Sequence, residues 1–275
     1  MAFERMAEGA LDYSPYRFGT SRLMFRGPRR RLEGGYMTVL GGTETYGRFI
    51  ETPYPALIEA QTGLRIFNFG CLNAGVDVFL NDAEVLAACR RGMATVVQIL
   101  GAHNMTNRYY AVHPRRNDRF LRASGLMKAI FREVDFTEFN FTRHMLSTLQ
   151  AASPEKFAIL AEELKAAWVA RMRLLLARLG GRSVLLWMAD HPPAEEGEPL
   201  RLDRDPLLVD RAMIQAVATQ TSAYVEVVGP AMAEAQGASG LVLSAYDVAA
   251  AAGLPGPAAH EEVARQLSPV LRELV

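Results

Sequence analysis

The chain has 275 residues and a mass of 30.3 kDa, which is enough for one large α/β domain or two small ones with a sizeable core. Half of the residues are hydrophobic, 22% are charged, and 30 basic side chains balance 30 acidic ones. This composition excludes wholesale disorder and gives no net charge that would attract nucleic acid or an anionic membrane. Two cysteines, Cys71 and Cys89, are too few for a disulfide framework or a cysteine-only zinc site.

The beginning of the chain, MAFERMAEGALDY, contains acidic residues and no apolar run, so a secretory signal is not expected. No stretch reaches about 18 uninterrupted apolar residues, so we expect no membrane span and a cytoplasmic location. The partner that we expect is a small-molecule substrate or ligand, without nucleic acid, and the oligomeric state stays open.

Residues 1–35 are irregular and rich in arginine and glycine, and we expect an N-terminal arm there. The arm contains a basic cluster, which is either a solvated loop or a lip that contacts an anion. Its members are Arg26, Arg29, Arg30 and Arg31. Residues 36–275 are expected to form a single α/β domain, with a helical insertion or lid at about 105–152.

Five short apolar runs predict strands, and most are near-continuous rather than alternating, which is typical of strands covered on both faces. They lie at 36–42, 65–70, 94–101, 182–190 and 223–230. Helical segments separate several of them, and alternation of strands with helices implies right-handed crossovers. The predicted fold is therefore a three-layer, doubly wound α/β architecture with a parallel sheet of about five strands.

Four helices are predicted with some detail. The segment 81–92 has Asn81 as the expected N-cap and Gly92 as its end. Residues 153–181 read as one long helix, capped by Ser153 and with one apolar face. The remaining two are 205–220 and 258–274. Between the third and fourth strands, about 80 residues are expected to mix loops and helices without a further strand of this kind.

In an open parallel sheet, ligands bind beyond the carboxyl ends of the strands, where the strand order reverses. The loops that leave the first three predicted strands are 41–47, 68–75 and 101–107, and all are rich in Gly, Asn and Thr. Glycine lets the backbone approach a ligand, while Asn and Thr supply short hydrogen-bonding groups. The sequence therefore predicts a polar site at this edge.

The same loops carry a resemblance to a known family. LGGTETYG (40–47) is similar to the first block of the SGNH, or GDSL-like, hydrolases, in which a strand ends in Gly-Asp-Ser or Gly-Gly-Ser. NFGCLNAG (68–75) and GAHN (101–104) resemble the second and third blocks, and PAAHEEVARQL (257–267) resembles the last. The chain thus looks like a divergent member of that superfamily with Thr in place of the nucleophilic Ser.

The resemblance implies an esterase or acyltransferase acting on an acyl or related ester, without a cofactor. Thr43 would take the nucleophile position, Gly75 and Asn104 would be oxyanion donors, and His260 would be the base. Thr43 departs from the family because its β-methyl restricts χ1 and crowds attack. Pro257 stands three residues before His260, where the family usually has an aspartate.

Two further departures concern alignment. The family's histidine would fall near Leu254 when the last helix is aligned on its Ala and Leu positions. The family more often places its asparagine two residues after the glycine, a position that His103 holds here. The second hypothesis is therefore a catalytically degenerate SGNH-fold protein that binds a small anionic or sugar-like ligand through the same loops.

The residues themselves suggest several roles. His260 at a helix start lies near the positive end of the helix dipole, which favours a neutral imidazole able to act as a base. Glu44, beside Thr43, is either an acid–base group or a cap of the helix that follows. Asp190 and His191 follow the fourth strand and have either a direct role or only loop polarity.

The remaining candidate substrate-binding residues lie in the loops and at the start of the insertion. They are Gly42, Asn73, His103, Arg115 and Arg116. The arginines can bind an anion in bidentate fashion, or belong to an Arg–Asp network that holds the lid. No nucleotide-binding glycine motif, metal-ligand cluster or G-x-S-x-G elbow is found, so no metal site is expected.

Overall fold

The computed structural model describes residues 10–195, 197–229, 240–244 and 247–275. Its centre is a sheet of five parallel strands in the order β2-β1-β3-β6-β7. The strands are β1 (Tyr36–Gly41), β2 (Arg65–Gly70), β3 (Thr95–Gln98), β6 (Ser183–Ala189) and β7 (Ala223–Val228). The predicted doubly wound α/β fold is confirmed, and all five predicted strands are present.

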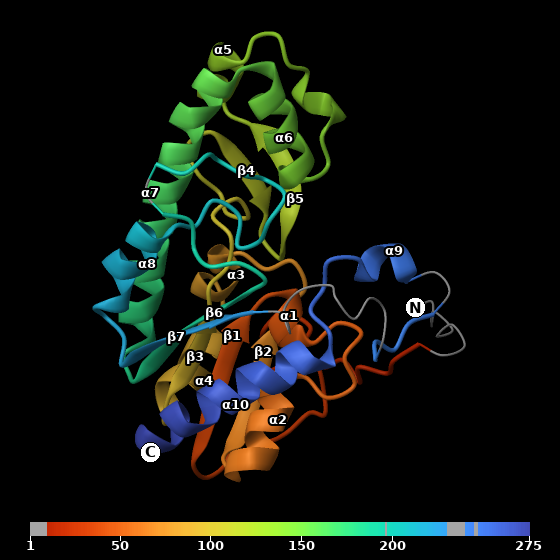
Figure 1. Ribbon diagram of the computed structural model, residues 1–275, viewed down its shortest axis with the longest axis vertical. Helices are drawn as coiled ribbons and strands as arrows, with labels where there is room; N and C mark the ends of the chain where they lie inside the picture. The colour runs from red at the N-terminus through yellow and green to blue at the C-terminus, as the bar shows by residue number, and fades with distance from the viewer. Residues whose placement is uncertain (1–9, 196, 230–239, 245–246) are drawn as a thin grey trace.

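Helices cover both faces of this sheet (Figure 1). One face packs against α2 (Tyr54–Thr62) and α10 (Pro257–Glu273). The other face packs against α3 (Val76–Leu80), α4 (Ala83–Arg91), α7 (Pro154–Leu179) and α8 (Arg211–Ala218). Successive strand residues alternate between the two cores, as Val39 and Leu40 of β1 show, and this explains the near-continuous apolar runs.

The long helix is confirmed, and its ends follow from local chemistry. The Ser153 hydroxyl accepts from the amide of Lys156, Pro154 occupies the first turn, and Gly180 ends the helix at φ 63°. Trp168, in the middle of α7, is fully buried, and its indole N–H donates to the Leu100 carbonyl at 2.7 Å. The helix thereby fixes the loop that leaves β3.

Two helix predictions need correction. The N-cap of α4 is Asp82, whose carboxylate accepts from the Val85 amide at 3.0 Å, whereas Asn81 ends the preceding helix α3. The helix expected over 205–220 is limited to α8, which starts after Asp210. The segment before it turns back on itself, with Leu208 at φ 60°, and supplies residues to the pocket described below.

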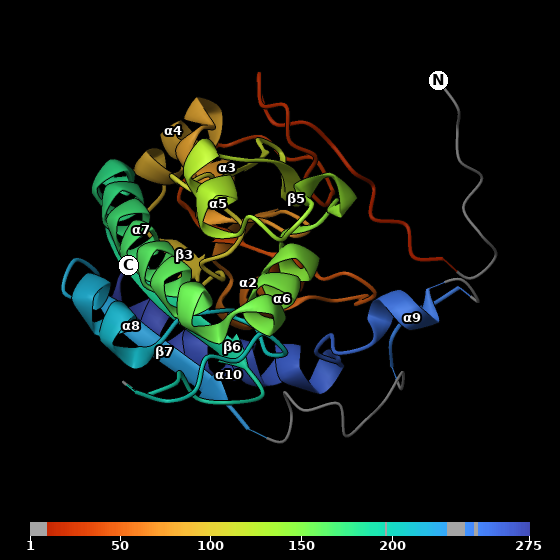
Figure 2. The same cartoon turned by 90° about the horizontal axis from the view of Figure 1, so that it is seen from above.

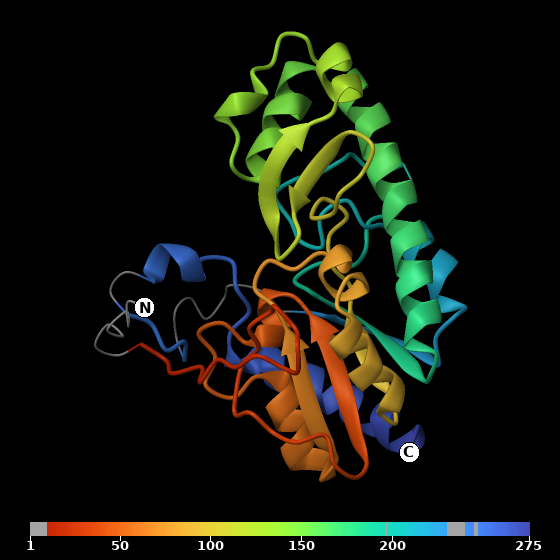
Figure 3. The ribbon, with the colours of Figure 1, turned by 180° about the vertical axis from the view of Figure 1, so that it is seen from behind.

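The insertion between β3 and α7 contains two strands that the sequence analysis missed. They are β4 (Tyr110–His113) and β5 (Arg116–Ala123), which pair as an antiparallel hairpin. The short helices α5 (Gly125–Ile130), η1 (Phe136–Glu138) and α6 (Thr142–Ala152) follow. Figure 2, seen from above, shows this unit lying over the sheet, and in Figure 3 α7 runs from it down to the sheet.

Two remaining helices are short: α1 (Thr43–Tyr46) directly after β1, and α9 (Val248–Ala251) before α10. Among the described helices, none is both long and apolar enough to cross a bilayer. The last residue of the segment predicted as the fifth strand, Pro230, lies outside the described residues.

Candidate functional site

A pocket of about 820 Å³ opens at the carboxyl edge of the sheet. It lies where the strand order reverses, between β1 and β3, which is where open α/β sheets bind ligands. The loops after β1, β2, β3 and β6, the insertion, and the segments 203–206 and 250–255 all contribute to its wall. Its polar lining residues are Thr43, Glu44, Arg48, Asn73, Gln98, His103, Asn104, Asp118, Thr142, Arg143, Asp190, Asp203, Arg204 and Asp205.

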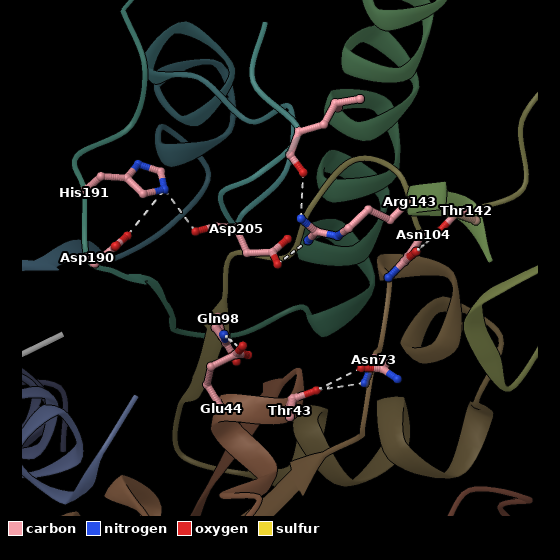
Figure 4. A network of polar contacts seen from close by, with 11 residues as sticks. Thr43, Glu44, Asn73, Gln98, Asn104, Thr142, Arg143, Asp190, His191 and Asp205 are labelled. Atoms are coloured by element: carbon pink, nitrogen blue, oxygen red, sulfur yellow. Dashed lines mark hydrogen bonds and ion pairs between the residues drawn. The ribbon is translucent and has the colours of Figure 1, made fainter. Parts of the chain in front are cut away.

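Thr43 is the first residue of α1 and is almost fully buried. Its Oγ1 accepts from the backbone amide of Asn73 at 3.0 Å and donates to the Asn73 Oδ1 at 3.3 Å (Figure 4). Asn73 adopts φ 52°, a left-handed conformation that asparagine tolerates better than most residues. The Thr43 hydroxyl is therefore used to hold the loop after β2, and no imidazole bonds to it.

Glu44 follows Thr43 in α1, and Gln98 lies at the end of β3. The Gln98 amide nitrogen donates to Glu44 Oε2 at 2.8 Å, and its oxygen accepts from the Gly42 amide at 2.9 Å. The pKa of the Glu44 carboxyl group is raised above its ordinary value, mainly by burial and also by the negative charge of Asp205. The hydrogen bond from Gln98 acts in the opposite direction. Gly42 is the N-cap of α1 without a side-chain capping hydrogen bond, and Glu44 lies in the first turn of this helix, where its own backbone amide also lowers the pKa of the carboxyl group.

The third loop places His103 and Asn104 in the pocket wall. Asn104 Oδ1 accepts from the Thr142 hydroxyl of α6 at 2.7 Å, which connects the loop to the insertion. His103 is buried, and its Nδ1 has no hydrogen-bond partner among the described residues. Burial lowers the pKa of His103 to about 4, while Asp205 raises it and Arg143 lowers it. The ring is therefore neutral at physiological pH.

The side of the pocket away from the strands is formed by α6 and by the segment that precedes α8. Arg143 of α6 forms an ion pair with Asp205 and donates to the Leu202 carbonyl at 2.8 Å (Figure 4). The His191 Nε2 lies 3.1 Å from the Asp205 carbonyl and 3.9 Å from an Asp190 oxygen. Asp190 and Asp205 line the pocket, whereas His191 holds the backbone beside it.

His260 is not brought to Thr43, which corrects the expected arrangement. It belongs to α10, is 1% exposed, and does not line the pocket. Its Nδ1 accepts from the backbone amide of Tyr54, in the first turn of α2, at 3.1 Å, and the two rings stack at 5.9 Å. This hydrogen bond satisfies an amide that the helix itself leaves free. Burial, with Arg26 nearby, lowers the pKa of His260 to about 3.

Three other expected site residues also lie away from the pocket wall. The Gly75 amide donates to Asn117 Oδ1 at 3.1 Å and is thus already engaged. Arg115 and Arg116 lie at the tip of the β4–β5 hairpin, are exposed, and do not line the pocket. The structure therefore brings together Gly42, Thr43, Glu44, Asn73, His103 and Asn104, but not Gly75, His260, Arg115 and Arg116.

The arrangement resembles neither a metal centre nor a paired nucleophile and base. In the described part of the chain, no group of three or more His, Cys, Asp or Glu residues is placed to hold a metal ion. Near Leu254, where the SGNH resemblance would place the histidine, the described lining residues carry no titratable side chain: they are Ala250, Ala252, Gly253, Leu254 and Pro255. What the pocket offers is a set of hydrogen-bonding groups beside a few apolar ones.

The family model of a domain of unknown function, DUF6473, matches residues 1–275. The chain belongs to this family. Among curated proteins, no sequence match to this DUF6473 chain is found.

Solved structures similar to this DUF6473 chain include enzymes that act on esters. A catalytic mutant of the acetylxylan esterase Axe2 from Geobacillus stearothermophilus is 19% identical, with a TM-score of 0.44, and 88% of this chain and 94% of that one are covered. The lipase Lip_vut3 from a goat rumen metagenome has 11% identity and a TM-score of 0.41, with 86% and 97% covered. A G-D-S-L family protein from Desulfitobacterium hafniense has 13% identity and a TM-score of 0.37, with 86% and 99% covered. At such low similarity, the site has to be judged by its own geometry.

Several pocket residues of this DUF6473 chain were missed by the sequence analysis. Gln98 had a visible signal, because it is a polar residue between the apolar pairs Val96–Val97 and Ile99–Leu100. Phe141, Arg143 and Asp205 had none, because only the tertiary fold brings α6 and the segment before α8 to the sheet edge.

Proposed function

We propose that the protein binds a small, hydroxyl-rich, sugar-like molecule in the pocket at the carboxyl edge of the sheet. The volume of about 820 Å³ lies within the range of small-molecule sites. The polar wall mixes acceptors and donors, as the neighbouring Thr43, Asn73 and Asp118 illustrate. Such a wall suits a ligand whose hydroxyl groups both donate and accept.

The charge of the wall favours a neutral ligand over an anion. Three arginines line the pocket against five carboxylates, which are Glu44, Asp118, Asp190, Asp203 and Asp205. Arg143 is moreover paired with Asp205, so its charge is compensated. Asn73 and Asn104 add amide groups that bind hydroxyls without a charge requirement.

The observation that carries the proposal is an exposed aromatic ring at this polar wall. Phe141, the residue before α6, lines the pocket and is 46% exposed, although phenylalanine is a large apolar side chain. An exposed aromatic face next to hydrogen-bonding groups fits the apolar C–H face of a sugar ring, which also presents hydroxyls at its edge. Thr43, in contrast, already has its hydroxyl engaged by Asn73.

A ligand screen tests this proposal. Neutral mono- and disaccharides, sugar acids and sugar phosphates are compared by the rise in melting temperature that each gives, and the best is titrated calorimetrically. We expect a neutral sugar to stabilise the protein and Phe141→Ala to weaken its binding about tenfold, in line with the loss of an aromatic contact. Leu126→Ala is the matched control, because Leu126 is 47% exposed on α5 but lies outside the pocket.

Two results would contradict the proposal. One is stabilisation by sugar phosphates or sugar acids alone, which would favour an anion site at the arginines. The other is equal weakening by Phe141→Ala and Leu126→Ala, which would place the ligand elsewhere.

An ester hydrolase or acyltransferase is the second candidate, and one observation favours it. Thr43 and Asn104, to which the SGNH resemblance assigns the nucleophile and an oxyanion donor, line the same pocket. Efficient attack by a hydroxyl requires a base within hydrogen-bond reach, and among the described residues both hydrogen bonds of the Thr43 hydroxyl are with Asn73.

We therefore expect neither the natural protein nor Thr43→Ser to hydrolyse p-nitrophenyl acetate faster than Thr43→Ala, measured by release of p-nitrophenol. Thr148→Ala is the control for general effects of removing a threonine, because Thr148 lies on α6 and outside the pocket wall. Turnover by Thr43→Ser that Thr43→Ala lacks would favour ester chemistry over the binding function.

A further inference from the structure

A buried chain of hydrogen bonds leads from the pocket into the core of the protein. It begins at Glu44, whose Oε2 accepts from the Gln98 side chain at 2.8 Å. The Gln98 oxygen accepts from the Thr45 hydroxyl at 2.6 Å, and the Thr45 hydroxyl lies 2.7 Å from the Tyr54 hydroxyl. Gln98, Thr45 and Tyr54 are 4%, 0% and 0% exposed, so water does not interrupt the chain.

The direction of every hydrogen bond in this chain is fixed. The Gly42 amide can only donate, and it donates to the Gln98 oxygen at 2.9 Å, so the Gln98 nitrogen has to face Glu44. Thr45 uses its single proton toward Gln98, and the Tyr54 hydroxyl is therefore the donor to Thr45. The carboxylate oxygen at the end of the chain is an acceptor by necessity.

Gly41, the last residue of β1, leaves room for the side chains of Thr45 and Gln98. A Cβ atom at Gly41 would overlap the Thr45 hydroxyl and the Gln98 oxygen. Glycine at this position therefore allows the hydrogen bond between Thr45 and Gln98 to form beside the strand.

Charged residues from several elements line the pocket together with Glu44. Arg48, Asp190, Arg204 and Asp205 line the pocket with it, and Tyr54 lies behind it at the far end of the hydrogen-bond chain. Burial and Asp205 both favour a proton on Glu44, whereas the Gln98 hydrogen bond opposes it.

From this geometry we infer that Glu44 is the group that accepts a hydrogen bond from a hydroxyl of the bound ligand, and that Gln98, supported by Thr45 and Tyr54, is the residue that positions its carboxylate. The identity of the ligand rests on the proposed function. The positioning of Glu44 by Gln98 does not, because it concerns only groups of this chain.

Side-chain carbon NMR of ¹³C-labelled glutamate tests the positioning role directly. The Glu44 resonance is assigned by its loss in Glu44→Gln and is then followed as a function of pH. We expect Gln98→Met, which keeps the length of the side chain but removes both hydrogen-bonding groups, to make Glu44 titrate at higher pH. Tyr54→Phe should move the titration in the same direction by less, since only the far end of the chain is lost.

Two variants sharpen this experiment. Gln61→Met is the control, because Gln61, near the end of α2 and outside the pocket, also accepts a side-chain hydrogen bond, from the Ser268 hydroxyl at 2.7 Å. Gln98→Glu keeps an oxygen that can accept from Gly42 and Thr45, and it places a second carboxyl group against Glu44. Glu44 should therefore titrate at a still higher pH than in Gln98→Met. An unchanged Glu44 titration in Gln98→Met and Gln98→Glu would overturn the positioning role.

The ligand part has its own readout. For a sugar found in the screen, affinity should fall as the pH drops through the titration of Glu44, and Glu44→Gln should bind about tenfold more weakly and without this pH dependence. A pH-dependent affinity that persists in Glu44→Gln would overturn the role of Glu44 in binding. If no sugar binds at all, the proposed function fails, while the NMR titration still decides the role of Gln98.

Discussion

The imidazole of His260 is a neutral hydrogen-bond acceptor, because its Nδ1 accepts a hydrogen bond from the Tyr54 backbone amide at the start of α2. Its pKa falls from the ordinary 6.5 to about 3 because burial removes water from the charged form. The unfolded chain therefore binds a proton that the folded protein excludes between these values, and the free energy of unfolding has to decrease as the pH falls from about 6.5 toward 3.

His260→Asn should flatten this acid destabilisation. Asparagine does not titrate, and its Oδ1 can replace Nδ1 as the acceptor for Tyr54. We expect the slope of unfolding free energy against pH, from urea melts between pH 6.5 and 4, to drop by up to about 1.4 kcal/mol per pH unit. His103 contributes to the same window through its pKa of about 4, so a residual slope remains.

At neutral pH the same variant should be less stable than the natural protein, because asparagine leaves part of the imidazole volume empty. His144→Asn is the control, since His144 is exposed on α6. An identical pH slope in His260→Asn and His144→Asn would contradict the buried neutral state of His260.

At the scale of elements, the loops after β2 and β3 touch through Gly75. A Cβ atom there would overlap the backbone carbonyl of Asn104, and the Gly75 amide is held by the fully buried Asn117 of β5. The Asn117 side chain also donates to the His113 carbonyl at 3.0 Å, so one glycine fixes the relative position of two loops and the hairpin.

Gly75→Ala should therefore lower the free energy of unfolding by about 1–3 kcal/mol, as measured by denaturant titration, because the two loops have to separate. Gly125→Ala serves as the control, since nothing lies within 4 Å of a Cβ at Gly125 and alanine favours the helix α5 that begins there. Equal stability of Gly75→Ala and the natural protein would show that the loops separate without cost.

Strong local signals made some elements predictable. Helix α7 has a serine cap and a proline in its first turn, as the sequence predicts, and Gly180 ends it one residue before the end of the predicted segment. Strand β5 had no such signal, because its sequence RNDRFLRA is charged and its buried residues do not alternate regularly with exposed ones. Its strand character follows from pairing with β4, which is a tertiary effect.

At the scale of the whole molecule, the alternation of apolar strands with helices was sufficient to predict the sheet, because parallel strands need covered faces and long crossovers. The strand ends also indicated where the pocket lies, and Thr43, Asn73 and Asn104 do line it. The position of His260 was not predictable. The sequence indicates that a helix begins near His260. Where the N-terminus of that helix lies relative to the sheet edge depends on how α10 packs against α2.

The pocket wall is built from separate stretches of the chain. Glu44 and Gln98 are fixed by strands of the central sheet, whereas Phe141 and Arg143 belong to a unit inserted between β3 and β6. Under the proposed function, changes within that unit would alter ligand preference without touching the hydrogen bonds between Glu44 and Gln98. Under the same proposal, recognition and scaffold stability would be set by separate stretches of this chain, so one could change without the other.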